Sequence, residues 1–191
     1  MYSWGNDTST WRGPGRYNFD SARRGYLDDL AQSAAAKGPR SYTAPPGPDL
    51  GLVDPHGKRI HSDKKNPVIV AVDVTGSMAA WPGEIFDRLP LLYQTLSQYR
   101  DDVEISFCAI GDANSDRYPL QINEFASGVA LEDHLKALYP EGGGGGQSRE
   151  SYELFGYHVL QNAQTPNATS PFLIMFGDEG FYDTVDPDQA E

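Results

Sequence analysis

The stretch Pro67-Val-Ile-Val-Ala-Val-Asp73 (PVIVAVD) decides the fold class of this chain. It is a continuous run of apolar, mostly β-branched residues, which is typical of a strand covered by helices on both faces. Strands buried on both faces belong to parallel sheets, whose crossover connections are usually helical. The run therefore predicts an α/β fold with a mostly parallel sheet.

The sequence after this run continues the alternation of strands and helices. Residues 81–99 carry apolar side chains at helical spacing, and Pro90 is expected to begin, kink or interrupt that helix. VEISFCAI (103–110) and PFLIMFG (171–177) predict two further buried strands. Shorter elements are expected between them, namely a strand at QINEFA (121–126) and helices at 130–139 and 150–161. This order predicts a doubly wound α/β domain over residues 63–191.

Residues 1–62 differ in composition and predict an irregular N-terminal extension. They are rich in Gly, Pro, Tyr and Arg, and one helix is expected at residues 20–37, ended by Gly38-Pro39. LGLVDPHGKRIH (50–61) predicts two short strands around a turn at residues 54–57. We expect the extension to pack as an arm on the main domain. Its aromatic residues fit either a partner-binding patch or the arm's own buried face (Tyr2, Trp4, Trp11 and Tyr17).

The net charge of −12 is concentrated in the C-terminal part of the chain. Residues 1–62 carry eight basic and six acidic residues, whereas residues 63–191 carry seven basic and twenty-one acidic ones, a net charge of −14. Such a field repels nucleic acid phosphates and anionic lipid headgroups, and it attracts cations and basic partners. We therefore expect neither nucleic acid nor a membrane surface as a partner.

Signals for the cellular compartment are few. The start MYSWGNDTST (1–10) lacks the charged-then-apolar profile of a secretory signal, and no apolar stretch approaches the ~20 residues needed to cross a bilayer. Cys108 is the one cysteine, so no intrachain disulfide can form, and its apolar surroundings predict a buried, inert thiol. These features together predict a cytoplasmic protein.

Polar residues follow the ends of the three predicted buried strands. They are DVTGS (73–77), Gly111-Asp112 and GDEG (177–180). Ligands of open parallel sheets bind beyond the carboxyl ends of the strands, so these residues are expected to converge. Carboxylates gathered there repel one another unless a cation offsets their charge. Oxygen donors without His or Cys predict Mg²⁺, with Mn²⁺ or Ca²⁺ as alternatives.

DVTGS (73–77), after an apolar strand and before a helix, resembles the Asp-x-Ser/Thr-x-Ser motif of von Willebrand factor A-type (vWA) domains. In that family the motif belongs to the metal-ion-dependent adhesion site (MIDAS), where a bound metal accepts a carboxylate from a partner protein. The resemblance covers residues 65–180. It implies a Rossmann-like vWA fold with Asp73, Thr75 and Ser77 as metal ligands.

The resemblance implies two more ligands from later loops. GDEG (177–180) looks like the family's strand-end Asp, so Asp178 is expected as an outer ligand acting through water. SRES (148–151) is similar to the integrin β-subunit version of the site, in which a Glu at a helix start completes the metal's ligands. Glu150 is therefore the predicted fifth ligand, with Gln147 and Ser148 as alternatives.

The chain departs from the family in two ways. A glycine run (142–146) stands where the family usually has a recognisable Thr loop. The family also continues through further strands and helices after the strand that carries Asp178. We therefore expect that the domain is incomplete at its C-terminal end, or that a partner or the N-terminal arm covers the exposed sheet edge.

The implied function is a metal-dependent protein-interaction module without enzymatic activity. Intracellular bacterial domains of this family often resemble companions of AAA-type ATPases, so such an ATPase is an implied partner. A rival hypothesis is a metal-dependent hydrolase similar to the haloacid dehalogenase phosphatases. That family needs a second Asp two residues after the first as acid/base, and Thr75 occupies this position. A third possibility is a structural subunit of a larger assembly.

Ordinary structural roles compete with each of these interpretations. Thr75 and Ser77 could cap the following helix, and Glu150 could cap a later one. Asp112 fits either a residue supporting the site or a simple turn, and it stays outside the predicted ligand set. His56 and His61 are read as incidental surface residues rather than zinc ligands, because no Cys or third His joins them at ligand spacing.

Overall fold

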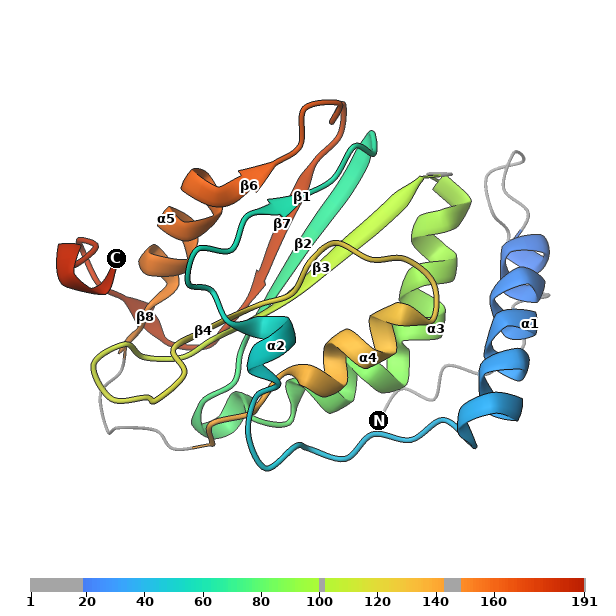
Figure 1. Ribbon diagram of the computed structural model, residues 1–191, viewed down its shortest axis with the longest axis horizontal. Coiled ribbons are helices and arrows are strands. Elements are labelled where there is room, and N and C mark those ends of the chain that lie inside the picture. Colours follow the sequence, from blue (N-terminus) through green and yellow to red (C-terminus); the bar gives the residue numbers. More distant parts are fainter. Residues whose placement is uncertain (1–18, 100–101, 143–148, 191) are drawn as a thin grey trace.

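A four-stranded sheet organises the chain in the computed structural model, which describes residues 19–99, 102–142 and 149–190 (Figure 1). The strand order is β4-β3-β2-β7. Strands β2 (Asn66–Asp73), β3 (Val103–Ile110) and β7 (Phe172–Phe176) run parallel, and β4 (Leu120–Ile122) pairs antiparallel with β3 at one edge. The expectation of a mixed α/β protein with a mostly parallel sheet is confirmed.

Helices cover both faces of the two central strands. Helices α3 (Trp81–Tyr99) and α4 (Ala130–Ala137) lie on one face, and α5 (Tyr152–Asn162) lies on the other (Figure 1). Alternate residues of β2 pack on opposite sides, with Val70 in the core under α3 and Ala71 in the core under α5. This double burial explains why the strand has no polar position between Asn66 and Asp73.

Two pairs of short parallel strands stand beside the main sheet. Strand β1 (Ile60–His61) pairs with β6 (Ala163–Gln164), and β5 (Arg149–Glu150) pairs with β8 (Gly180–Phe181). The second pair holds the chain before α5 beside the chain after β7. It therefore brings two of the predicted ligand loops together.

The described part of the N-terminal extension packs against α3 and α4. The expected helix is present as α1 (Phe19–Lys37), which runs along α3 (Figure 1). Lys37 forms an ion pair with Asp133 of α4, and Arg40 pairs with Glu132 and lies over the Phe86 ring. The aromatic residues of the first seventeen positions (Tyr2, Trp4, Trp11 and Tyr17) lie outside the described residues.

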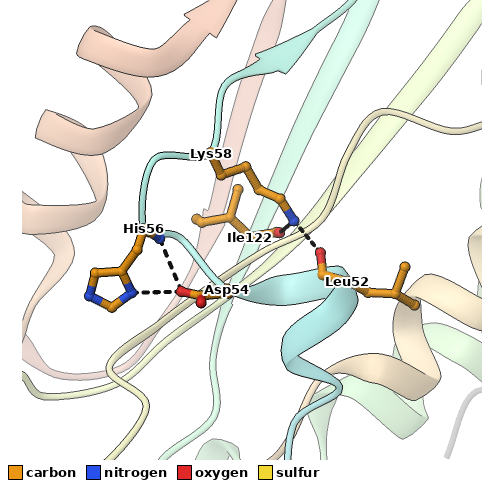
Figure 2. A network of polar contacts seen from close by, with 5 residues as sticks. All are labelled: Leu52, Asp54, His56, Lys58 and Ile122. Carbon is orange, nitrogen blue, oxygen red and sulfur yellow. Dashed lines mark hydrogen bonds and ion pairs between the residues drawn. The ribbon is translucent and has the colours of Figure 1, made fainter.

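The prediction of two strands within residues 50–61 is wrong for the first of them. Residues 50–53 form the short helix α2 (Leu50–Val53), because the Asp49 side chain accepts a hydrogen bond from Gly51 N and caps the turn. Asp54 then turns the chain by accepting hydrogen bonds from the backbone N and from Nδ1 of His56 (Figure 2). Local side-chain hydrogen bonds here outweigh the β-propensity of the apolar residues.

Lys58 fixes the turn after α2 to the main sheet. Its Nζ donates to the backbone O of Leu52 and, at 2.9 Å, to that of Ile122 in β4 (Figure 2). Burial lowers the pKa of this ammonium group. The contact ties the segment between α2 and β1 to the antiparallel edge of the sheet.

The expectation that residues 171–177 form a buried strand is half wrong. The strand exists as β7, but each of its five residues is exposed, by 36% to 55% (Phe172, Leu173, Ile174, Met175 and Phe176). Within the described ranges β7 pairs only with β2, so its second edge has no neighbouring strand. Whether a strand is buried depends on what lies beside it, and the composition of the strand alone does not predict this.

Smaller expectations have mixed outcomes. The helix predicted from residue 150 begins at Tyr152, and Pro90 lies inside α3 without ending it. Cys108 is buried as predicted, and burial raises the pKa of its thiol to about 11. Over the ranges that the structure describes, no helix has the length and apolarity that a membrane crossing requires.

Candidate metal site

The first predicted ligands lie where β2 ends. Asp73 is the last residue of the strand and is fully buried, and its Oδ1 accepts hydrogen bonds from both the backbone N and Oγ1 of Thr75, each at 2.8 Å. Gly76 adopts a positive φ of 41°, which lets the chain turn into the 3-10 helix Gly76–Met78. The strand end and the turn thus hold Asp73 and Thr75 in a fixed mutual orientation.

Glu150 joins this pair from a segment 75 residues further along the chain. Thr75 Oγ1 lies 2.8 Å from Glu150 Oε1, and the Glu150 residue is only 4% exposed. Thr75 has one hydroxyl proton and two carboxylate neighbours, so it can satisfy only one of them as a donor. The other carboxylate oxygen of Glu150, Oε2, is buried and has no hydrogen-bond partner among the residues that the structure describes.

Ser77 and Asp178 form a second pair on the exposed side of the same strand ends. Ser77 Oγ donates to Asp178 Oδ2 at 2.6 Å, which joins the loop after β2 to the loop after β7. The β5–β8 pairing holds Glu150 opposite Phe181, three residues after Asp178. All five predicted ligands therefore take part in hydrogen bonds that connect the loops at this edge of the sheet.

Negative charge shapes the electrostatics of the site. The pKa of Glu150 is raised to about 7, mainly by burial, and the charges of Asp73, Asp116 and Asp112 add to this, whereas the hydrogen bond from Thr75 opposes it. Burial also raises the pKa of Asp116. A site with these properties is stabilised by either a proton or a metal cation close to Glu150.

Tyr152 is a site residue that the sequence interpretation missed. Its hydroxyl donates to Asp73 Oδ2 at 2.7 Å, so both oxygens of that carboxylate are held by neighbours. The ring lies against the backbone of Gly177, where an added Cβ would meet Tyr152 Cζ at 2.5 Å. Helical spacing over residues 150–161 places Tyr152 on one side with Phe155 and Val159, which suggests only an apolar helix face. The signal available in the sequence was its position two residues after Glu150.

Asp112 acts chiefly within its own loop. It is buried after the end of β3, and its carboxylate accepts hydrogen bonds from Asn114 N at 3.0 Å, Ser115 Oγ at 3.1 Å and the Tyr182 hydroxyl at 3.0 Å. These bonds shape the turn and tie it to the chain after β8. Asp112 thus contributes charge near Glu150 without contacting the predicted ligands through a hydrogen bond.

The ligand set remains a prediction, although its members are close. In the described ranges, no group of three or more His, Cys, Asp or Glu side chains is arranged to hold a metal ion. Two of the five predicted ligands are hydroxyls, and they contact the three carboxylates: Thr75 lies against Asp73 and Glu150, and Ser77 lies against Asp178. The alternatives Gln147 and Ser148 lie outside the described residues. The oxygen-only donor set and the unpartnered Oε2 of Glu150 fit a hard cation such as Mg²⁺.

Replacing Tyr152 by Phe is expected to weaken Mg²⁺ binding by about 10-fold, because outer hydrogen bonds that orient a ligand typically contribute 10- to 100-fold to metal affinity. The change leaves the ring against Gly177 and removes only the hydroxyl that holds Asp73 Oδ2. Isothermal titration calorimetry with MgCl₂ measures the effect. Tyr157→Phe, an exposed position of the same helix, is the matched control. Equal Mg²⁺ affinity in both variants and the wild type would contradict a positioning role for Tyr152.

Comparison of the chain with protein-family models, with curated proteins and with solved structures finds no match. The functional assignment therefore depends on the geometry described above and on the motif resemblance.

Proposed function

We propose that this chain is a vWA-type, doubly wound module that binds a partner protein through a divalent metal ion, with Mg²⁺ as the proposed ion, held by Asp73, Thr75, Ser77, Glu150 and Asp178. The observation that carries the proposal is the Thr75–Glu150 contact of 2.8 Å, which links two segments that the motif resemblance had paired. The unpartnered, buried Oε2 of Glu150 supports it, because such an oxygen otherwise costs free energy.

The proposed ion replaces hydrogen bonds that hold the site in its absence. The Thr75 hydroxyl lies within hydrogen-bond distance of Asp73 and Glu150 and donates to one of them, and the Ser77 hydroxyl donates to Asp178. A bound cation would take the lone pairs of these hydroxyls and of the carboxylates. Asp73 and Glu150 would be the inner carboxylates because they are buried, and Asp178 would act through water from the exposed side. Mg²⁺ keeps several water ligands, which leaves a position for a carboxylate of the partner.

The partner would combine an accessible Asp or Glu with a basic surface. A carboxylate that displaces a metal-bound water supplies the specific contact, and the net charge of −14 over residues 63–191 favours basic surroundings. An AAA-type ATPase is a candidate partner by the family resemblance. A cytoplasmic location would accompany such a partner.

Binding of short peptides tests this function. Immobilised peptides with a single Glu in a Lys-rich background are expected to retain the chain in 5 mM MgCl₂, chosen at about the millimolar level of a weak site. Retention is expected to disappear in EDTA and with Gln in place of the Glu, because the carboxylate is the metal ligand. Surface plasmon resonance gives the affinity, and Ser77→Ala should weaken it.

Two outcomes would contradict the proposed function. Binding that persists in EDTA would show that charge alone retains the peptide. Metal-dependent hydrolysis of a phosphate ester that is lost in Asp73→Asn would favour the rival hydrolase, in which Asp73 is the nucleophile. The proposed module predicts no turnover in either protein.

A further inference from the structure

An apolar groove of about 650 Å³ lies between α3 and β7. Ile174 and Phe176 form its wall on the side of β7, and mostly apolar residues of α3 form the other wall. Among the described residues that line the groove, the charged ones are Glu84 and Arg88, and they pair with each other. The groove therefore offers apolar contacts beside a neutralised ion pair, which suits an apolar occupant.

One end of this groove adjoins the proposed metal site. Trp81 and Phe176, which line that end, stack with their ring centroids 5.4 Å apart. Asp178 follows Phe176 by two residues, so the two Cα atoms are within about 7 Å of each other. Ser77, which donates a hydrogen bond to Asp178, precedes Trp81 by four residues. The exposed pair of predicted ligands thus lies beside the stacked rings, and the groove leads away from it.

The groove is long enough for a peptide segment. It follows α3 from Trp81 to Thr95, which is about 21 Å at the helical rise of 1.5 Å per residue. An extended chain advances about 3.3 Å per residue, so about six residues cover this length. A segment that starts at the metal can therefore reach the far end of the groove.

The groove is too small to hold a protein by itself. Ile174 and Phe176 are exposed by only 38% and 36%, whereas a standard interface buries about 800 Å² per partner. A carboxylate already bound to the metal, however, would bring the adjacent residues of its own chain to the groove at a high effective concentration. Apolar contacts that are weak alone would then add to the affinity of the metal contact.

We propose that the groove binds the apolar side chains that adjoin the metal-bound Asp or Glu in the partner's own sequence. This inference rests on the proposed function and specifies its partner. The partner presents a carboxylate next to a run of about six residues that is rich in Leu, Ile, Val or Phe. The metal binds the carboxylate, and the groove distinguishes this carboxylate from the many others on protein surfaces.

Surface plasmon resonance with matched peptides in MgCl₂ tests the proposal. Both peptides contain one Glu and the same number of Lys residues. One carries Leu or Val at every second position of a six-residue run beside the Glu, and the other carries Ser there. Versions with the run before and after the Glu cover both chain directions. The apolar peptide is expected to bind at least 10-fold more tightly in one direction, because burial of even one apolar side chain has about this effect.

Variants of β7 locate the apolar contact. Ile174→Lys puts a charge in the groove and should abolish the difference in affinity between the two peptides, while the Mg²⁺ affinity measured by isothermal titration calorimetry stays unchanged. Ile174→Thr keeps a β-branched side chain without a charge and should reduce the difference. Leu173→Lys is the matched control, because Leu173 is 48% exposed and lies on the opposite face of the same strand. Circular dichroism checks that each variant is folded.

The outcomes separate a failure of this inference from a failure of the proposed function. Equal, metal-dependent affinity for both peptides would overturn the inference alone, and another segment of the chain or a second copy would then be the occupant of the groove. A difference that persists in folded Ile174→Lys and Ile174→Thr, or that is lost in Leu173→Lys, would also overturn it. Failure of both peptides to bind in MgCl₂, or binding that is the same in EDTA, would overturn the proposed function and this inference with it.

Discussion

MgCl₂ is expected to raise the melting temperature of the wild type, and Asp73→Ala is expected to abolish this rise. A ligand at 100 times its dissociation constant stabilises the folded state by about 2.7 kcal/mol. For a chain of this size each kcal/mol shifts the melting temperature by about 2–4 °C, so the wild type should gain roughly 5–10 °C. Asp73 is the decisive position because it is buried at the strand end and contacts both Thr75 and Tyr152. Differential scanning fluorimetry with and without metal measures the effect.

The comparison is made within each protein, so a lower stability of the variant itself does not affect it. Removing the buried carboxylate takes the acceptor from the Thr75 backbone N–H and from the Tyr152 hydroxyl, and the metal-free variant should melt earlier than the wild type. Asp73→Asn keeps an acceptor oxygen and the side-chain shape while removing the charge. Asp28→Ala, an exposed position of α1, should keep the full Mg²⁺ effect. A Mg²⁺-dependent gain in both Asp73 variants as large as that of the wild type would rule out this residue as a ligand.

The parallel sheet and the convergence of residues at its carboxyl edge were predictable because each depends on a strong local signal. The strands β2 and β3 are continuous apolar runs, and a run buried on both faces has few alternative structures. The carboxyl ends of parallel strands meet at one edge, so polar residues that follow such runs must be neighbours. Ser77 and Asp178 illustrate this, since they follow β2 and β7 and share a hydrogen bond although 101 positions separate them.

The features that the sequence did not predict depend on competition between neighbouring groups. Residues 50–53 have the composition of a strand, but the Asp49 side chain accepts a hydrogen bond from Gly51 N and caps a short helix there. The strand β7 has the composition of a buried strand, and its exposure follows from the absence of a neighbour in the described ranges. A run of apolar residues is the same in sequence whether its cover comes from its own chain or from a partner.

Tyr152 shows a third limit, because one residue serves two roles. Its ring belongs to the apolar side of α5, which is what helical spacing detects, while its hydroxyl reaches Asp73 across the sheet edge. Spacing carries no information about a contact between residues 79 positions apart. Gly177 supplies the missing space, since any side chain there would meet the Tyr152 ring. The contacts of Tyr152 with Asp73 and Gly177 can be recognised only when the ends of β2 and β7 are placed in three dimensions.

The stability of the metal-free protein is expected to fall as pH rises from about 4.5 to 7, through the titration of Glu150. Its pKa in the folded chain is about 7, against an ordinary value of 4.5, so between these values the folded state binds more protons than the unfolded state. Stability rises with pH only where the unfolded state binds more protons, and here the reverse holds. The Glu150 contribution is fully present below pH 4.5 and is lost above pH 7, with a size of roughly 1–3 kcal/mol.

Urea unfolding of the wild type and of Glu150→Gln across this pH range, both in EDTA, isolates the effect. His134 and His158 have lowered pKa values and titrate with the opposite sign, but both proteins share them, so they cancel in the difference. The free energy of unfolding of the wild type, minus that of Glu150→Gln, should therefore fall as pH rises across this range. Parallel curves would show that Glu150 keeps an ordinary pKa.

Because a metal must displace the same proton, the stabilisation of the wild type by Mg²⁺ should be larger at pH 8 than at pH 5.5. A gain that is independent of pH would mean that any bound ion avoids Glu150, and the ligand would then have to come from another residue of this loop.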